Sequence, residues 1–213
     1  MTPQLILASR SPRRRDLLAH LGVPFRVVVP EVEENGAPAS SGQPEEVAET
    51  LALVKAEAVA RDEREGIVIA ADTIVVDGDT ILGKPADGAE AAETLCRLRG
   101  REHRVITGLA VVDASSGQRV ASHVVTAVRM RDYSHAEIAA YVARGDPLDK
   151  AGAYAIQDEQ FQPVVSYEGC YCNVVGLPLK ALLTLLRRAG LDITSHSFEE
   201  LPTECAACPI VVD

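Results

Sequence analysis

Apolar and polar positions along this chain follow two periods, which predict strands and helices in alternation. Short apolar runs that end in turn residues indicate strands, and apolar residues spaced three or four positions apart indicate helices. The first predicted elements are strand 5–8, helix 12–21, strand 25–29, helix 45–64, strands 67–76 and 80–82, and helix 87–98. The core-facing side of the helix at 45–64 is predicted to comprise Val47, Leu51, Val54 and Ala58.

The later part of the chain is dominated by two long apolar segments, 104–113 and 119–131. A turn at 115–117 joins them, so they are predicted to form an antiparallel pair. The remaining expected elements are helices at 134–144 and 178–190, an exposed loop at 30–44 and a poorly anchored tail at 191–213. Because alternating strands and helices give way to a hairpin, we predict a single α/β domain with a mixed sheet over residues 1–190.

Composition limits the possible partners more than it limits the fold. Of the 213 residues, 47% are apolar and 24% are charged, as in ordinary globular proteins. The formal net charge of −10 opposes nonspecific binding to nucleic acids and to anionic membranes. A polyanionic ligand should therefore be small and should meet a local basic cluster or a metal ion. No apolar run approaches the roughly 20 residues that span a bilayer, and the first residues do not resemble a secretion signal, so we expect a cytoplasmic protein.

Residues 9–16 combine a helix start with a concentration of positive charge. Ser11 suits the N-cap and Pro12 the first turn, which places Arg13 and Arg14 where the helix macrodipole disfavours cations. An anion at this end of the helix would remove the conflict, since backbone N–H groups, serine hydroxyls and guanidinium groups all bind phosphate. The alternative is a solvated basic turn, and the segment alone leaves both interpretations open.

Asp72 is the second unusual position, because it lies inside an apolar stretch that is predicted to be a buried strand. A buried carboxylate has to be hydrogen-bonded, paired with a cation or bound to a metal. It could activate a water molecule or bind a metal ion, or it could be tied to neighbouring backbone amides. Lys55 lies on the preceding helix, and Lys84 follows the hairpin that returns toward the same strand ends. Glu34, in the long loop, could supply metal oxygens, but each of these charges, taken alone, is more often solvated than functional.

Five cysteines fit a reducing compartment better than a disulfide framework. Four of them form two pairs, Cys170 with Cys172 and Cys205 with Cys208. A structural zinc site is conceivable, but Cys-x-Cys is not the usual ligand spacing and the second pair lies in the expected tail. The spacing therefore argues against zinc, and a zinc-stabilised scaffold is kept only as a rival interpretation.

Six short segments occur in an order that matches a known family. The segments are Leu7-Ala8-Ser9-x-Ser11-Pro12-Arg13-Arg14, Ala71-Asp72-Thr73-Ile74-Val75, Gly83-Lys84-Pro85, His103-Arg104-Val105-x-Thr107-Gly108, Asp149-Lys150-Ala151-Gly152-Ala153-Tyr154-x-Ile156-Gln157 and Val174-Val175-Gly176-Leu177-Pro178. Together they resemble the Maf family of nucleoside triphosphate pyrophosphatases, also called septum formation proteins. The segment that ends at Gln157 is similar to the branch that acts on dTTP and UTP, whereas another branch, which prefers 7-methyl-GTP, carries a different sequence there.

The resemblance implies a two-lobed α/β fold of the Maf and ITPase kind, with helices flanking a mixed sheet and a cleft between the lobes. It implies a cytoplasmic homodimer that hydrolyses a nucleoside triphosphate to the monophosphate and pyrophosphate with a divalent cation, magnesium or manganese. The matching positions make Asp72 the general base and, with Glu34, a metal ligand. The residues that the resemblance assigns to substrate binding are Ser9, Arg13, Arg14, Lys55, Thr73, Lys84 and Gln157. Among them, Arg13, Thr73 and Gln157 would tune which base is accepted.

The chain also departs from the family pattern. After Gln157 the residues 158–161 replace a glycine-containing turn, Asp146 replaces a glutamate, and the tail from residue 203 has no counterpart. The first departure concerns the loop expected to recognise the base. Two rival functions stay open: a non-catalytic nucleotide sensor that regulates cell division, and a 7-methyl-GTP pyrophosphatase.

Overall fold

The computed structural model describes residues 3–32, 42–191, 193, 205 and 208. The described residues form a seven-stranded mixed sheet in the order β2-β1-β3-β5-β6-β7, with β4 paired to the end of β3. The strands are β1 (Leu5–Ala8), β2 (Phe25–Val28), β3 (Ile67–Asp77), β4 (Thr80–Leu82), β5 (Glu102–Asp113), β6 (Arg119–Met130) and β7 (Val164–Glu168). β1 is parallel to β2 and β3, whereas β3, β5, β6 and β7 follow one another antiparallel.

Helices begin largely where capping residues predict them. The helical elements are α1 (Pro12–Ala19), α2 (Pro44–Ala60), α3 (Gly88–Leu98), α4 (His135–Ala143), the 3₁₀ turns η2 (Asp146–Asp149) and η3 (Ala151–Ala153), α5 (Tyr171–Val175) and α6 (Leu179–Arg188). Ser11, Asp87 and Ser134 each accept backbone N–H groups at the start of α1, α3 and α4. These N-caps satisfy donors that have no partner inside the helix.

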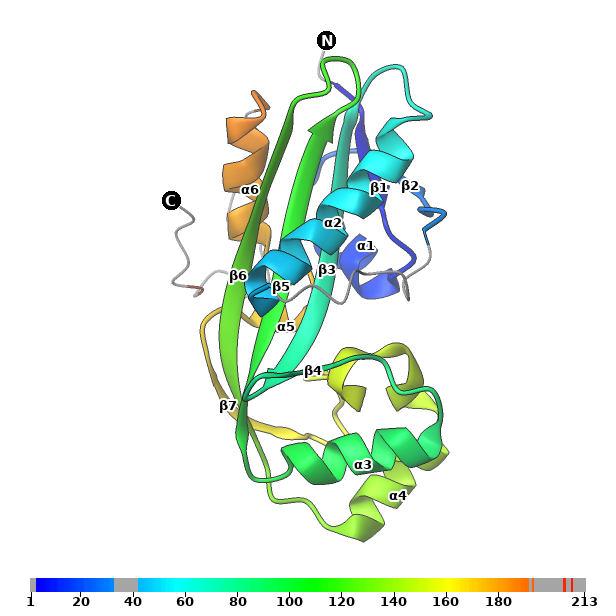
Figure 1. Cartoon of the computed structure of the whole chain (residues 1–213), viewed down its shortest axis with the longest axis vertical. Helices are drawn as coiled ribbons and strands as arrows, with labels where there is room; N and C mark the ends of the chain where they lie inside the picture. The colour runs from blue at the N-terminus through cyan, green and yellow to red at the C-terminus, as the bar shows by residue number, and fades with distance from the viewer. Residues whose placement is uncertain (1–2, 33–41, 192, 194–204, 206–207, 209–213) are drawn as a thin grey trace.

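The sheet carries two lobes, because β3, β5 and β6 extend beyond the helices that cover their first part (Figure 1). In the first lobe α2 covers one face of the sheet, while α1, α5 and α6 pack on the other. In the second lobe α3 and α4 pack on the far ends of the long strands around a separate apolar cluster. The predicted two-lobed mixed α/β fold is thus confirmed. Among the described residues, no helix is both long enough and apolar enough to cross a bilayer.

The predicted core-facing side of α2 is wrong. The buried side consists of Ala48, Ala52, Lys55, Ala56 and Val59, whereas Val54 is 45% exposed. The cause lies on β5, where a Cβ added to Gly108 would stand 2.1 Å from the carbonyl oxygen of Ala48. The helix backbone therefore touches the strand backbone, and only small side chains fit between them. The larger apolar side chains of α2 are left to line the space between the lobes.

The sequence pattern does not predict the strand β7, the helix α5 or the 3₁₀ turns η2 and η3. β7 is an edge strand with four exposed residues and lacks an apolar alternation, and α5 has only five residues, too few to show a helical period. The expectation of a poorly anchored tail is also wrong at its four described positions. Leu191, Ile193, Cys205 and Cys208 are buried within the apolar cluster that contains α6.

Candidate active site

A cleft of about 790 Å³ lies between the two lobes. Its walls come from the β1–α1 turn, α2 and the middle of β3 on one side, and from the segment after β4 and residues 149–157 on the other. The cleft is lined by all the described residues that the sequence places at the site: Ser9, Arg13, Arg14, Lys55, Asp72, Thr73, Lys84 and Gln157. The remaining predicted residue, Glu34, lies outside the described residues. A cavity of this size is typical of a site for a small molecule.

Asp72 and Lys55 form an ion pair in this cleft. The Nζ atom of Lys55 lies 2.6 Å from Oδ1 of Asp72, and the two side chains are 9% and 15% exposed. The pair depends on Gly108, which is the register partner of Asp72 on β5 and lets α2 lie directly on the sheet. The charges of such a sheltered pair interact more strongly than charges in water do. Asp72 is therefore held in place beside a cation, with one carboxylate oxygen bonded to that cation.

The β1–α1 turn is held by its own serines. The backbone N–H of Ser11 donates to Oγ of Ser9, and Oγ of Ser11 accepts the backbone N–H of Arg14. Ser9 is 4% exposed and follows the last residue of β1. The predicted N-cap at Ser11 is confirmed, and the helix N-terminus faces the cleft.

The two arginines of this turn have different surroundings. Arg14 donates from Nη2 to Oγ1 of Thr73 at 3.0 Å and from Nε to the carbonyl oxygen of Gly176 at 2.8 Å. Its guanidinium thereby joins α1 to β3 and to the end of α5. Arg13 instead reaches across the cleft, with Nη1 3.3 Å from Oδ2 of Asp149. Neither arginine belongs to a simple solvated turn, because each contacts a distant part of the chain.

A chain of hydrogen bonds continues inward from Thr73, and the sequence analysis missed its members. Oγ1 of Thr73 lies 2.9 Å from Oγ1 of Thr107, which donates to the carbonyl oxygen of Asn173. The fully buried Asn173 donates in turn to the carbonyl oxygen of Val105 and to Oγ1 of Thr126. The only signal in the sequence is that Thr107 lies in one family segment and Asn173 directly precedes another, which does not show that the two residues meet.

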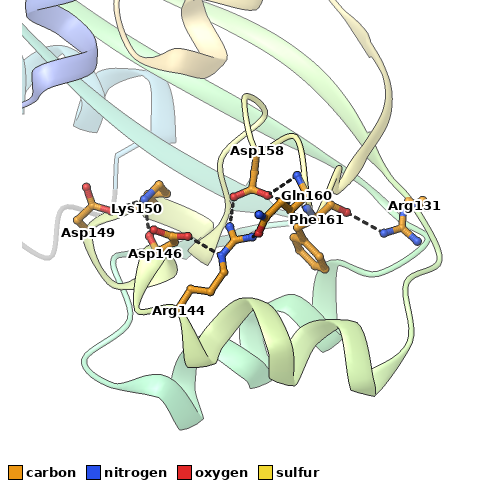
Figure 2. A network of polar contacts seen from close by, with 8 residues as sticks. All are labelled: Arg131, Arg144, Asp146, Asp149, Lys150, Asp158, Gln160 and Phe161. Atoms are coloured by element: carbon orange, nitrogen blue, oxygen red, sulfur yellow. Dashed lines mark hydrogen bonds and ion pairs between the residues drawn. The ribbon is translucent and has the colours of Figure 1, made fainter.

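The opposite wall of the cleft is fixed largely by charged side chains. Arg144, at the end of α4, contacts the carboxylate of Asp158, donates to Oδ2 of Asp146 at 2.7 Å and to Oε1 of Gln160 at 2.5 Å (Figure 2). Asp158 also accepts the backbone N–H of Phe161 at 2.7 Å. This loop replaces the turn expected after Gln157, and Arg144 anchors it beside the exposed Gln157 side chain.

The pKa shifts of Asp158 and His103 are consistent with these contacts in the wall of the cleft. Desolvation acts to raise the pKa of Asp158, but the hydrogen bonds from Phe161 and Arg144 outweigh it and lower the pKa below its ordinary value. Beneath the cleft, burial lowers the pKa of His103 to about 4, so this side chain is neutral near pH 7. Its Nε2 atom lies 2.8 Å from the hydroxyl of Tyr154. His103 therefore supports the wall at Tyr154 rather than supplying charge to the cleft.

A metal ion at Asp72 would need ligands beyond the protein. Among the described residues, Asp72 does not belong to any group of three or more His, Cys, Asp or Glu side chains that could hold a metal. Magnesium commonly binds one or two carboxylates, with substrate phosphates and water completing its coordination. The carboxylate of Asp72 at the wall of an open cleft fits that mode of binding.

The fold and the cleft are those of a two-lobed α/β protein with a small-molecule site, and comparison with known proteins gives its family. The family model described as Maf-like protein matches residues 4–189. The chain belongs to the Maf-like family, as the six segments predict.

Several relatives are similar over nearly their whole length. A dTTP/UTP pyrophosphatase of Thermomicrobium roseum is 48% identical over 206 residues, 97% of this chain and 93% of that protein. A second protein of that name, from Desulforamulus reducens, is 50% identical over 190 residues, 89% of this chain and 98% of its own. Among solved structures, a dITP/XTP pyrophosphatase from Mycobacterium abscessus is 18% identical, covers 61% of this chain and 75% of its own, and has a TM-score of 0.40.

Proposed function

We propose that this chain hydrolyses dTTP and UTP to the monophosphate and pyrophosphate. The names of its relatives support the reaction and the substrates. The observation that carries the proposal is the sheltered Lys55–Asp72 pair, 2.6 Å apart, in a cleft whose walls also hold Ser9, Arg13 and Lys84. A base and a set of cationic and hydroxyl groups thus face one cavity, as attack of water on a phosphate requires.

Asp72 acts as the general base in this proposal. One carboxylate oxygen bonds to Lys55, and the other accepts the proton of the attacking water. Lys55 fixes the carboxylate and adds positive charge beside the phosphorus. A magnesium or manganese ion, when bound at Asp72, would neutralise phosphate charge and make the water more acidic. Glu34 stays a candidate ligand for that ion.

The remaining predicted residues divide between the two ends of the substrate. Ser9, Arg13, Arg14 and Lys84 would hold the triphosphate, with Arg14 also bracing Thr73. Gln157, on the loop that Arg144 anchors, would contact the base. The apolar side chains of α2 that line the cleft offer a surface against which the base or sugar can pack.

A panel of nucleotides tests the proposal. The purified protein, with magnesium, is given dTTP, UTP, dCTP, ATP, GTP and 7-methyl-GTP, and released pyrophosphate is measured. We expect turnover of dTTP and UTP above that of the others. Preference for 7-methyl-GTP would support the rival branch of the family, and binding without any pyrophosphate release would support the nucleotide sensor.

A homodimer is also part of the proposal, on the strength of the family resemblance alone. Light scattering on the purified protein, as it elutes from a size-exclusion column, measures the mass of the particle in solution. A mass near twice the chain's 22.7 kDa supports the dimer, and a mass equal to one chain contradicts it.

A further inference from the structure

Four cysteines from two distant parts of the chain meet on the side of the sheet that α6 covers. Cys170 and Cys172 stand at the start of α5, and Cys205 and Cys208 follow α6. Cys170, Cys172 and Cys205 are 0% exposed, and Cys208 is 5% exposed. All four belong to one buried cluster with Leu179 and Leu182 of α6. The fifth cysteine, Cys96, lies on α3 in the other lobe.

The thiols contact one another directly. The thiol of Cys170 lies in hydrogen-bonding contact with those of Cys172, Cys205 and Cys208, and the thiols of Cys172 and Cys205 also contact each other. None of these cysteines is in a disulfide. The cysteines are thus gathered as a group of four, not as two separate pairs.

The backbone around the group is held in place. The N–H of Asn173 donates to the carbonyl oxygen of Cys170 at 3.1 Å and lies near its sulfur, and the N–H of Leu179 lies near the sulfur of Cys205. The N–H of Cys208 donates to the carbonyl oxygen of Cys205, and Nζ of Lys180 donates to the carbonyl oxygen of Cys208 at 2.7 Å. Backbone N–H groups and a nearby cation are suited to stabilising sulfur that carries negative charge.

We propose that Cys170, Cys172, Cys205 and Cys208 together bind one zinc ion that fastens the C-terminal segment to the α5–α6 corner. Four thiols and one Zn²⁺ give a tetrathiolate complex of net charge −2 and release four protons. Four cysteines that share a single buried location supply the ligand number of a closed structural site. The two pairs, which seemed badly spaced in sequence, act here as two halves of one ligand set.

Zinc binding requires the sulfurs to turn from one another toward a common ion. As the side chains lie, no group of three or more His, Cys, Asp or Glu residues in the described parts of the chain could hold a metal. A tetrahedral ion with bonds of about 2.3 Å keeps its sulfurs about 3.8 Å apart, a spacing that side-chain rotation can provide when the thiols already touch. The backbone hydrogen bonds of the two segments need not change.

The site would also influence the cleft. Helix α5 ends at Gly176, whose carbonyl oxygen accepts a hydrogen bond from Arg14, and Cys170 exchanges hydrogen bonds with Thr126, which Asn173 contacts in turn. Fastening α5 therefore fixes two supports of the wall formed by Arg14 and Thr73. Loss of zinc is expected to loosen this corner without removing any residue that contacts substrate.

Metal content tests the proposal. The untagged full chain is purified without chelator, and zinc is measured for the wild type and for the Cys205→Ser, Cys172→Ser and Cys96→Ser variants. We expect about one zinc per chain in the wild type and in the Cys96→Ser control, and less than about a tenth of that in the other two. Cobalt(II) added to chelator-treated protein is expected to show the intense visible bands of a tetrahedral thiolate complex.

The wild type alone can overturn the proposal, even if a variant fails to fold. Wild-type protein that contains no zinc and gives no thiolate bands with cobalt contradicts it. So does an intact mass that is four daltons below the reduced value, because the four thiols would then be joined as two disulfides. Equal zinc in the wild type and in a folded Cys205→Ser variant would show that the metal binds elsewhere.

Discussion

The two walls of the cleft are built in different ways. On the first lobe, Asp72 and Lys55 are set by strand register and by the contact of α2 with Gly108, and both side chains are largely buried. On the second lobe, the loop after Gln157 is held by side-chain contacts of Arg144 near the protein surface (Figure 2) and by the buried ring of Phe161, which packs against Tyr133 and Tyr141. Backbone packing tolerates little adjustment, whereas exposed ion pairs are weak and depend on salt. The first wall is thus suited to fixing the reacting groups and the second to adapting to the base.

Replacing the proposed base should have the largest effect. Asp72→Asn keeps the shape of the side chain but removes the proton acceptor, so turnover of dTTP should fall by about a thousandfold. Pyrophosphate release measures the loss, and the unfolding temperature shows whether the variant is folded. A folded variant with full activity would contradict the role of Asp72.

Adding one methyl group at the contact between α2 and β5 tests the construction of the first wall. Gly108→Ala places a Cβ 2.1 Å from the carbonyl oxygen of Ala48, so the helix must shift. We expect a loss of about 3 kcal/mol in the free energy of unfolding. Gly83→Ala is the control for stability, because its Cβ would meet no atom within 4 Å. Equal stability of the two variants would show that the close contact is unimportant.

The same contact explains why the sequence predicted the strands better than the packing. Apolar runs and caps identify β1, β3, β5 and α1, since these signals are local. The buried side of α2 is not local, because it depends on a glycine about sixty residues away on another strand. Val54 is therefore exposed to the cleft although its spacing favoured the core.

The candidate site shows a similar division. Asp72 and Arg14 could be singled out because each violates a local rule, a charge in an apolar strand and a cation at a helix N-terminus. Thr107 and Asn173 violate no such rule, and the family segment that contains Thr107 does not show which residue it contacts. Their importance arises only from the hydrogen bonds that bring three separate segments together.

Removing the anchor of the second wall should weaken substrate binding more than turnover. Arg144→Ala removes the contacts with Asp146, Asp158 and Gln160, each worth a fraction of a kcal/mol at the surface. We expect KM for dTTP to rise about fivefold while kcat changes little. The effect should shrink at high salt, where the wild-type contacts are themselves screened.

Two further variants sharpen this result. Arg144→Lys keeps the charge but lacks the forked guanidinium. Its KM for dTTP should therefore lie between that of the wild type and that of Arg144→Ala. Arg119→Ala removes an exposed arginine that pairs with Glu57 on the other lobe and should leave KM unchanged. A fall in kcat equal to the rise in KM would mean that the second wall also positions the reacting groups.

The smallest expected effect is a loss of stability in the second lobe when Glu137 is protonated at low pH. Hydrogen bonds from the backbone of Ser134 and from Arg131 lower the pKa of Glu137 to about 2. Because the ordinary value is 4.5, the ionised form contributes stability above pH 4.5, and this contribution is lost as the pH falls from 4.5 towards 2. Arg131 also donates to the carbonyl oxygen of Phe161, so protonation of Glu137 releases a partner of the residue that helps to hold the loop.

Two variants, Glu137→Gln and Glu102→Gln, isolate the stability that the ionised Glu137 contributes. Glu137→Gln cannot ionise, so its unfolding temperature should fall less steeply than that of the wild type over the same acid range. Glu102→Gln removes the same charge at an exposed position on β5 and should keep the wild-type slope. Hydrogen exchange should show the acid-induced opening at residues 131–144 and 158–162, where charged contacts hold the structure, before it reaches β3. If β3 opened first, the first wall would be the weaker of the two, opposite to what its buried packing indicates.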